Sequence, residues 1–138
     1  MNIENISKKI KFNKDGLVTV VAQDYNTNEI LMVAYMNQEA LKRTIETNRV
    51  TYWSRSRQKF WVKGESSGNI QQLKEIYIDC DGDAILLKIL QLGDNGNTEI
   101  GASCHEGYRS CFFRKLKDDD WEIIGTKLFD PDEVYGKK

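Results

Sequence analysis

The chain has 138 residues, of which 40% are apolar and 30% are charged, and its formal net charge is −1. This length fits one domain with its own core, and the composition is ordinary for a soluble globular protein. The balanced charge gives no global attraction to nucleic acid or to an anionic membrane, and residues 1–14 lack the apolar segment of a signal peptide. The longest apolar run, residues 84–92, is too short to span a bilayer. We therefore expect a single cytoplasmic domain, residues 1–138, with neither a membrane nor nucleic acid as its partner.

The first half of the sequence predicts a hairpin and a helix. Residues 17–23 and 30–36 are rich in apolar and β-branched side chains, and the turn-forming residues 24–28 separate them. Asn37 is a suitable helix N-cap, and apolar side chains then recur at helical spacing as far as residue 48. This is the one main helix that the sequence predicts.

The second half predicts short strands joined by polar turns. A tight turn at 93–97 precedes a short run at 98–102, a hairpin turn is expected at 117–120, and the only proline, Pro131, falls in a C-terminal tail. Many short strands with one helix favour an α+β domain with a mainly antiparallel, folded or barrel-like sheet. The expected strands cover residues 50–55, 59–63, 73–78, 84–92, 110–116 and 121–124.

An acidic run, Asp79-Cys80-Asp81-Gly82-Asp83, follows the expected strand 73–78. If the chain stays extended here, the three carboxylates point to one face and Cys80 points to the other. A hard cation such as Mg²⁺ would relieve the repulsion among the carboxylates, and a thiol suits Zn²⁺. The simpler alternative is a solvated turn, because Asp and Gly are common turn residues.

Three cysteines and the only histidine form a second set of candidate metal ligands. Cys80, Cys104 and Cys111 are an odd number of thiols, and a reducing compartment disfavours disulfides. The thiols are either small buried hydrophobes or thiolate ligands of Zn²⁺, with a fourth position open for water. Zinc lowers the pKa of bound water to about 7, and His105, next to Cys104, is placed to transfer a proton. A lone histidine is otherwise commonly a surface residue.

A basic segment, residues 53–68, supplies a candidate anion site. Residues 53–64 include four Lys or Arg residues and no acidic one. Arg forks match phosphate oxygens, and Ser hydroxyls with Gly-rich backbone amides can cradle them. A solvated cationic hairpin with core aromatic residues is the simpler alternative. The segment favours a phosphorylated nucleotide ligand, and the residues expected to bind it, together with Arg109 from the cysteine segment, are Trp53, Arg55, Ser56, Arg57, Trp61, Lys63, Gly64, Ser66 and Ser67.

Five motifs in this order resemble those of the phosphoribosyl-AMP cyclohydrolase family: VAYMN (33–37), YWSRSR (52–57), WVKGESSG (61–68), DCDGD (79–83) and CHEGYRSCF (104–112). The resemblance runs from about residue 18 to residue 114. It implies an enzyme of the third step of histidine biosynthesis, which hydrolyses the N1–C6 bond of the adenine ring of N1-phosphoribosyl-AMP to give ProFAR. Because nothing after Lys138 could hold the pyrophosphohydrolase domain fused to some members, we expect the monofunctional form. Glu106 departs from the small or neutral residue usual in the family.

The resemblance also implies the cofactors and the assembly. The family implies a homodimer with the zinc site at its interface, where Cys80 comes from the partner subunit. Water activated by zinc is expected to attack C6 of the purine, as in zinc deaminases, while His105 moves protons and Mg²⁺ and the basic segment hold the phosphates. The implied ligands are Asp79, Asp81 and Asp83 for Mg²⁺, and Cys80, Cys104 and Cys111 for one Zn²⁺ per subunit.

Two other interpretations compete with this one. A small β-rich nucleic-acid-binding module would use Trp53, Trp61 and the basic segment, but it leaves the Asp and Cys patterns unexplained. A zinc-dependent nucleoside deaminase would carry a His-x-Glu or Cys-x-x-Cys signature, and the sequence contains neither.

Overall fold

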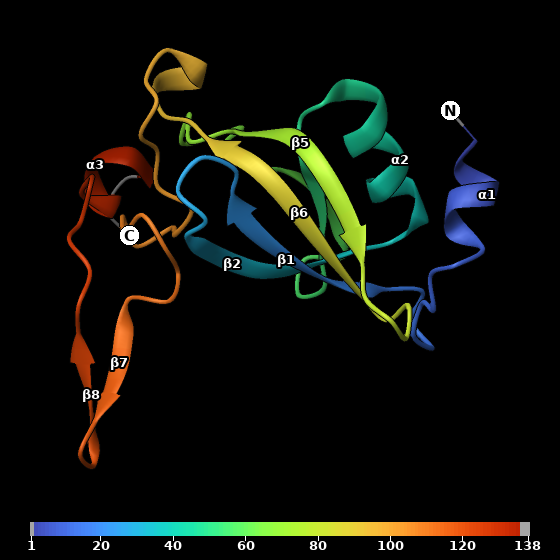
Figure 1. The fold of residues 1–138 in the computed structure, drawn as a ribbon. Helices are drawn as coiled ribbons and strands as arrows, with labels where there is room; N and C mark the ends of the chain where they lie inside the picture. The colour runs from blue at the N-terminus through green and yellow to red at the C-terminus, as the bar shows by residue number, and fades with distance from the viewer. Residues whose placement is uncertain (1, 136–138) are drawn as a thin grey trace.

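The computed structural model describes residues 2–135, and within this range the chain combines short helices with mainly antiparallel strands (Figure 1). This confirms the predicted α+β class. No helix of residues 2–135 is long and apolar enough to cross a membrane. In chain order the elements are α1 (Ile3–Ser7), β1 (Val18–Asp24), β2 (Ile30–Met36), α2 (Gln38–Thr47), β3 (Thr51–Ser54), β4 (Lys59–Val62), β5 (Gln71–Ile78), β6 (Ala84–Gln91), the 3-10 helix η1 (Asp94–Gly96), β7 (Arg114–Lys117), β8 (Asp120–Ile123) and α3 (Pro131–Tyr135).

The largest sheet has four strands in the order β2-β1-β6-β5. β1 pairs antiparallel with β2, and β5 pairs antiparallel with β6. The central pair, β1 and β6, is parallel, and the crossover between them contains α2 and the β3–β4 hairpin. The sheet is open, because β2 and β5 form its two edges in the described part of the chain. No barrel closes there, so the barrel-like part of the prediction is not confirmed.

One face of this sheet lines the main core. Every second residue of β1 and of β6 is buried, which is the period of a strand with one face turned inward. Ala40 and Leu41 of α2 join the same cluster of buried side chains. The Thr44 hydroxyl also accepts the Thr51 N–H at 3.0 Å, and this bond ties α2 to β3. The segment that carries the basic residues is therefore fixed to the core at its start.

Helix α2 begins and ends where the sequence predicts. The Asn37 side chain accepts the Ala40 N–H at 2.8 Å, and Asn48 ends the helix with a φ of 60°. The prediction of one main helix missed the short segments α1, η1 and α3, which have too few residues to show a helical period. Helix α3 begins at Pro131, whose fixed φ suits the first helical position.

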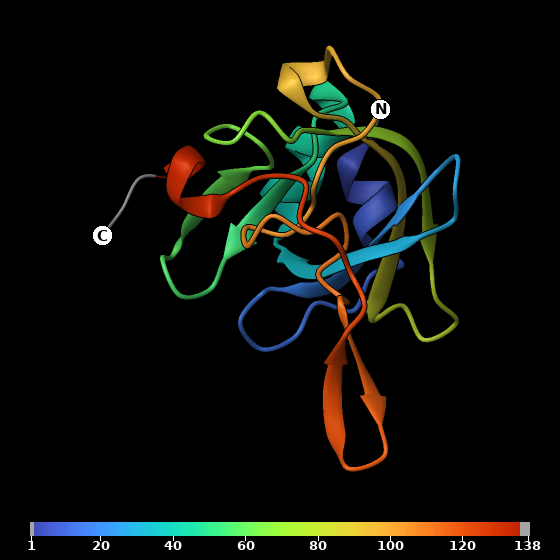
Figure 2. The same cartoon turned by 90° about the vertical axis from the view of Figure 1, so that its left-hand side faces the viewer.

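Strands β7 and β8 form a separate hairpin that projects away from the rest of the molecule (Figures 1 and 2). Lys117 lies opposite Asp120, so the hairpin turn is where the sequence predicts it. The first strand is shorter than the predicted range 110–116, because the Cys111 N–H donates to the Leu31 carbonyl at 2.7 Å instead of pairing within the hairpin. This bond fastens the base of the hairpin to β2.

Candidate active site

Cys104 and Cys111 lie near each other on one loop beside β2. The loop turns at Gly107, whose φ of 99° lies in the left-handed region that favours glycine. The Cys104 sulfur accepts the Glu106 N–H at 3.4 Å. Partial burial raises the pKa of the Cys111 thiol to about 11, and the nearby Cys104 sulfur adds to the effect. His105 is exposed on the same turn. The two sulfurs form a thiol pair that can bind a soft metal with release of their protons.

Lys63 lies behind this thiol pair, with 6% of its surface exposed. Its ammonium group donates to the Ser103 carbonyl and lies 4.8 Å from the centre of the Trp61 ring. Burial lowers the pKa of Lys63 to about 8, and the negative charge of the two cysteine sulfurs acts in the opposite direction. The sequence assigned Lys63 to phosphate binding, whereas the structure places it against the loop that carries the thiols.

The acidic run forms the turn between β5 and β6 rather than the end of an extended strand. β5 ends at Ile78, Gly82 has a φ of 76°, and the Asp79 carboxylate accepts the Asp83 N–H at 3.1 Å. The expected separation of Cys80 and the carboxylates onto opposite faces therefore does not apply, because alternation requires an extended chain. A hydrogen bond to Asp79 and its negative charge raise the pKa of Asp83. A divalent cation would relieve this crowding of carboxyl groups.

The acidic turn and the loop that carries Cys104 and Cys111 lie at opposite ends of β6 (Figure 1). The turn comes just before the strand, and at the far end the Gln91 side chain donates to the Ala102 carbonyl at 3.4 Å, close to the thiol pair. Eight strand residues span roughly 25 Å, so Cys80 does not reach Cys104 and Cys111 within one chain. In the described range 2–135, no three His, Cys, Asp or Glu side chains gather closely enough to hold a metal.

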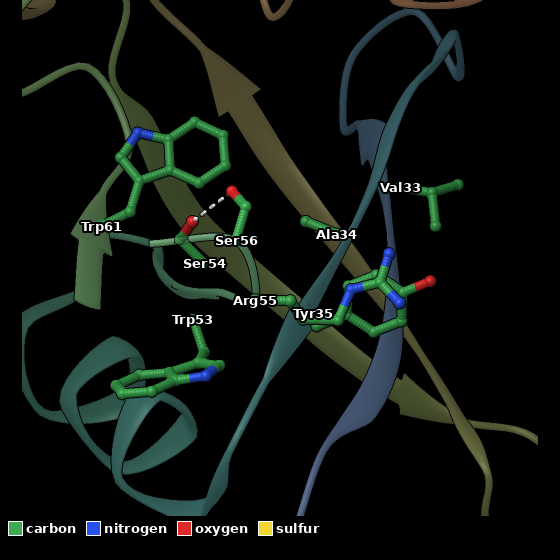
Figure 3. Close-up of a pocket in the computed structure, with 8 residues that line it drawn as sticks. All are labelled: Val33, Ala34, Tyr35, Trp53, Ser54, Arg55, Ser56 and Trp61. Carbon is green, nitrogen blue, oxygen red and sulfur yellow. Dashed lines mark hydrogen bonds between the residues drawn. The ribbon is translucent and has the colours of Figure 1, made fainter. Parts of the chain in front are cut away.

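A cleft of about 490 Å³ lies between β2 and the β3–β4 hairpin, and this volume suits a nucleotide (Figure 3). The Arg55 guanidinium stacks on the Tyr35 ring at 3.9 Å. The hydroxyls of Ser54 and Ser56 lie 3.5 Å apart, and Trp61 lines the cleft from β4. The cleft thus combines a cation, two hydroxyls and an aromatic face.

A second cleft, of about 360 Å³, shares Trp53 and Arg55 with the first. Asp15, Asn37 and Gln58 add polar groups to its lining. Among residues 2–135, Arg55 is the one cation in the linings of the two clefts, and the Asp15 carboxylate makes the second cleft less suited to an anion than the first.

The other residues expected to bind ligand have varied surroundings. Arg57 and Ser66 are exposed. The Ser67 hydroxyl accepts the Asn69 N–H at 3.1 Å, which shapes its own loop. Gly64 has a φ of 85°, and a side chain there would collide with the backbone of Asn69. Gly64 is therefore required by the close approach of two chain segments.

Arg109 is held inside the protein instead of in either cleft. Its guanidinium lies 3.0 Å from the Asp24 carboxylate and 3.2 Å from that of Glu29. It also donates to the carbonyls of Gln91 and Gly101, at 3.0 and 2.9 Å. These bonds occupy most of its N–H groups, so its role in this structure is to anchor the thiol loop.

Tyr35, Ser54 and Ser103 were not among the site residues predicted from the sequence. Tyr35 lies between two buried residues of β2, so strand alternation could have placed it on the outer face. Nothing in the sequence points to Ser103, because Lys63 binds its backbone carbonyl and not its side chain.

The thiol pair and the larger cleft are neighbours. Trp61 lines the cleft, and Lys63, two residues further on, donates to the carbonyl of Ser103, the residue before Cys104. Groups that can bind a metal and groups that can bind an anion thus meet around the end of β4. An α+β domain with this arrangement falls in the class of small-molecule enzymes rather than that of nucleic-acid-binding modules.

Comparison with known sequences identifies the family. The sequence profile described as phosphoribosyl-AMP cyclohydrolase matches residues 32–113. A protein of that name from Chlorobium limicola is 55% identical over 130 residues, which are 94% of this chain and 89% of that protein. The namesake from Vesicomyosocius okutanii is 52% identical over 129 residues, 94% of this chain and 97% of that protein. The protein of the same name from Methanothermobacter thermautotrophicus is 51% identical over 126 residues, which are 90% of this chain and 86% of that protein. The chain belongs to the phosphoribosyl-AMP cyclohydrolase family, which confirms the resemblance and the expectation of an enzyme.

Proposed function

We propose that this chain hydrolyses the N1–C6 bond of the adenine ring of N1-phosphoribosyl-AMP, the third step of histidine biosynthesis. Family membership supports the reaction. The structural observation that carries the proposal is the position of Lys63 and Trp61, which joins a thiol pair to a nucleotide-sized cleft. Neither the thiol pair nor the cleft alone would suffice, because the reaction needs an activated water next to a bound purine.

The donor chemistry fits the two implied metals. Cys104, Cys111 and the partner subunit's Cys80 would hold Zn²⁺, since thiolates are its preferred soft ligands. Asp79, Asp81 and Asp83 would hold Mg²⁺, which prefers carboxylate oxygen, and the crowded Asp79 and Asp83 fit that need. When bound, zinc supplies a water that ionises near neutral pH. Because one chain holds Cys80 far from the other thiols, this zinc site requires a homodimer.

The side chains of the cleft would bind and orient the substrate. Arg55 and the hydroxyls of Ser54 and Ser56 are suited to phosphate oxygens, and Trp61 presents an aromatic face to the purine. The substrate carries two phosphoribosyl groups, and Arg55, which both clefts share, is suited to the phosphate of one of them. Lys63 holds the thiol loop against this binding surface through the Ser103 carbonyl.

The bond changes follow from the chemistry of the ring. Water adds to C6, the N1–C6 bond breaks, and its electron pair goes to N1, which takes up a proton. C6 keeps its amino nitrogen and the new oxygen as a carboxamide, while N1 stays on the opened formimino arm. His105, exposed beside Cys104, would accept the proton of the attacking water and return it to N1.

The test is to incubate purified protein with N1-phosphoribosyl-AMP and follow the ultraviolet change as the purine ring opens. We expect turnover that falls when magnesium is chelated and disappears when zinc is also removed. Fully metallated protein without turnover would overturn the proposed substrate. A Cys104→Ala variant with an unchanged rate would overturn the role of zinc while leaving the substrate in place.

A further inference from the structure

Tyr35 forms part of the wall of the larger cleft, and Arg55 lies against its ring. The two side chains come from different elements, since Tyr35 belongs to β2 and Arg55 follows β3. The central carbon of the Arg55 guanidinium lies 3.9 Å from the centre of the Tyr35 ring, and Figure 3 shows the guanidinium across the ring. The negative face of an aromatic ring attracts a cation at this distance. The contact therefore holds the cation at one defined part of the cleft wall.

The fold holds the two partners with different firmness. Tyr35 lies inside β2, opposite Thr19 of β1, and its neighbours Ala34 and Met36 are buried. Arg55 is exposed on the turn between β3 and β4. A long arginine side chain has many rotamers, and a ligand that must order them binds more weakly. A ring fixed in the sheet can order the Arg55 side chain before the ligand arrives.

The stacked guanidinium keeps its N–H groups free. Stacking uses the flat face of the group, whereas its five N–H donors lie in the plane and point outward. Within residues 2–135 the arginine ion pairs are those of Arg43 and Arg109, and the Arg55 guanidinium forms neither an ion pair nor a hydrogen bond. The whole planar fork is therefore available to the oxygens of a phosphate.

Arg43 shows that stacking on a ring is not sufficient for such a site. Its guanidinium lies over the Phe60 ring, also at 3.9 Å, but it pairs with the Glu39 carboxylate at 3.7 Å as well. A carboxylate beside the cation competes with an anionic ligand for the same N–H groups. Both residues of this pair lie outside the lining of the larger cleft. Arg55 differs by having a stacked face, unpaired N–H groups and a place in the cleft.

We propose that Tyr35 is a positioning residue, which holds the Arg55 guanidinium flat against β2 so that its N–H groups bind a substrate phosphate. This role rests on the proposed function for the identity of the substrate. Tyr35 acts on the phosphate only through Arg55. It should therefore strengthen the binding of a phosphorylated ligand and leave the binding of the same ligand without its phosphate unchanged.

The test measures the binding of AMP and of adenosine by calorimetry, with protein that carries both zinc and magnesium. The two probes differ only in the phosphate, and wild type should bind AMP roughly tenfold or more tightly than adenosine. Tyr35→Ile removes the aromatic face and keeps a side chain that suits a strand. It should raise the dissociation constant of AMP by roughly tenfold and that of adenosine by less than about twofold.

Companion variants separate the ring face from the other properties of Tyr35. Tyr35→Phe keeps the face and lacks only the hydroxyl, so it should bind AMP as wild type does. Arg55→Met, on an exposed turn, should lose at least as much AMP affinity as Tyr35→Ile, and adding Tyr35→Ile to it should cause no further loss. The matched control is Tyr25→Ile, whose ring lies 5.7 Å from the Lys74 ammonium and outside both clefts. It should leave AMP binding unchanged, and circular dichroism checks that each variant is folded.

Kinetics with N1-phosphoribosyl-AMP add a readout that a structural role would not give. Tyr35→Ile should raise KM with little change in kcat, because the phosphate contact is the same before and during the reaction. Equal binding of AMP and adenosine to wild type, equal losses of both in Tyr35→Ile, a loss in Tyr35→Phe or a further loss in the Arg55→Met background would overturn the inference. Wild type that binds AMP as expected but does not turn over the substrate would count against the proposed reaction and not against the Tyr35–Arg55 pair.

Discussion

The Arg109 guanidinium lies 3.0 Å from the Asp24 carboxylate, and this ion pair joins the thiol loop to the end of β1. The side chain of Asp24 is almost fully buried, and that of Arg109 largely so. Since Arg109 also bonds to carbonyls of Gln91 and Gly101, one side chain connects β1, β6 and the loop. The position of the thiol pair therefore depends on Arg109, a residue that the sequence alone predicted to bind the substrate.

Breaking this pair should destabilise the protein. Arg109→Met leaves the Asp24 carboxylate buried without its partner, and we expect the free energy of unfolding to fall by about 3 kcal/mol. The control is Lys117→Met, which removes an exposed ion pair to Glu122 at 3.5 Å and should cost less than about 0.5 kcal/mol. Urea unfolding followed by circular dichroism measures both, and equal losses would contradict the role of Arg109.

The same pair predicts a dependence of stability on pH. Burial opposes the ionisation of Asp24, but N–H groups of Thr27 and Gln91 and the charge of Arg109 outweigh it and lower the pKa. The unfolded chain therefore binds this proton more readily, so the stabilisation is complete above the unfolded pKa of about 4 and is lost as pH falls through the lower folded value. Between pH 5 and pH 2, the urea concentration at the midpoint of unfolding should fall less steeply for Asp24→Asn than for wild type. If the midpoints of the two proteins fall in parallel with pH, Asp24 is not the cause of the pH dependence.

Lys63 should influence zinc binding through the thiol loop. Lys63→Met keeps much of the side-chain volume but removes the bond to the Ser103 carbonyl and the positive charge beside the sulfurs. We expect zinc affinity to drop by about tenfold or more, as for other groups that orient metal ligands. Competition with a chromophoric chelator measures this directly, without substrate. Lys59→Met, on the exposed surface of β4, is the control, and an equal affinity for both variants would contradict the prediction.

Mixed dimers test whether Cys80 acts across subunits. Cys80→Ser and Cys104→Ser should each be inactive alone, because each removes a thiol from every zinc site. When the two are unfolded together and refolded in equal amounts, about half of the dimers are mixed, and each mixed dimer has one complete site. Activity should therefore return to about one quarter of the wild-type value. If no activity returns, the third thiol does not come from the partner subunit.

The sequence by itself determined those features that depend on a few neighbouring residues. Strand β2 covers the predicted range, and α2 lies between the predicted Asn37 cap and Asn48. The hairpin turns and the basic segment also fall where expected, since turn chemistry and side-chain alternation act over two to five residues. The family motifs were likewise readable, because they are short runs of neighbouring residues.

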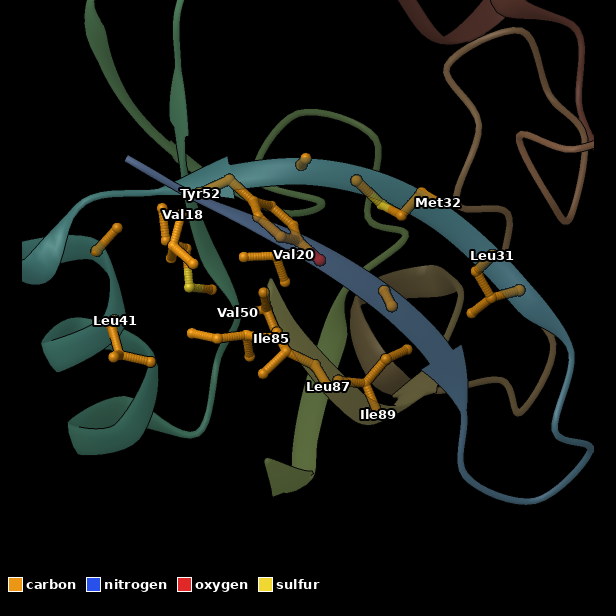
Figure 4. Packing of buried hydrophobic residues seen from close by; sticks show 14 of the residues in the cluster. Val18, Val20, Leu31, Met32, Leu41, Val50, Tyr52, Ile85, Leu87 and Ile89 are labelled. Atoms are coloured by element: carbon orange, nitrogen blue, oxygen red, sulfur yellow. The ribbon is translucent and has the colours of Figure 1, made fainter. Parts of the chain in front are cut away.

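Only the tertiary structure decided which distant segments meet. The parallel pairing of β1 with β6 places Val20 opposite Ile85, and Figure 4 shows these side chains within one core. The same packing buries Lys63 behind the thiol pair and keeps Cys80 at the far end of β6. No local rule contains this information, because strand order and burial follow from how the whole chain covers its apolar surface.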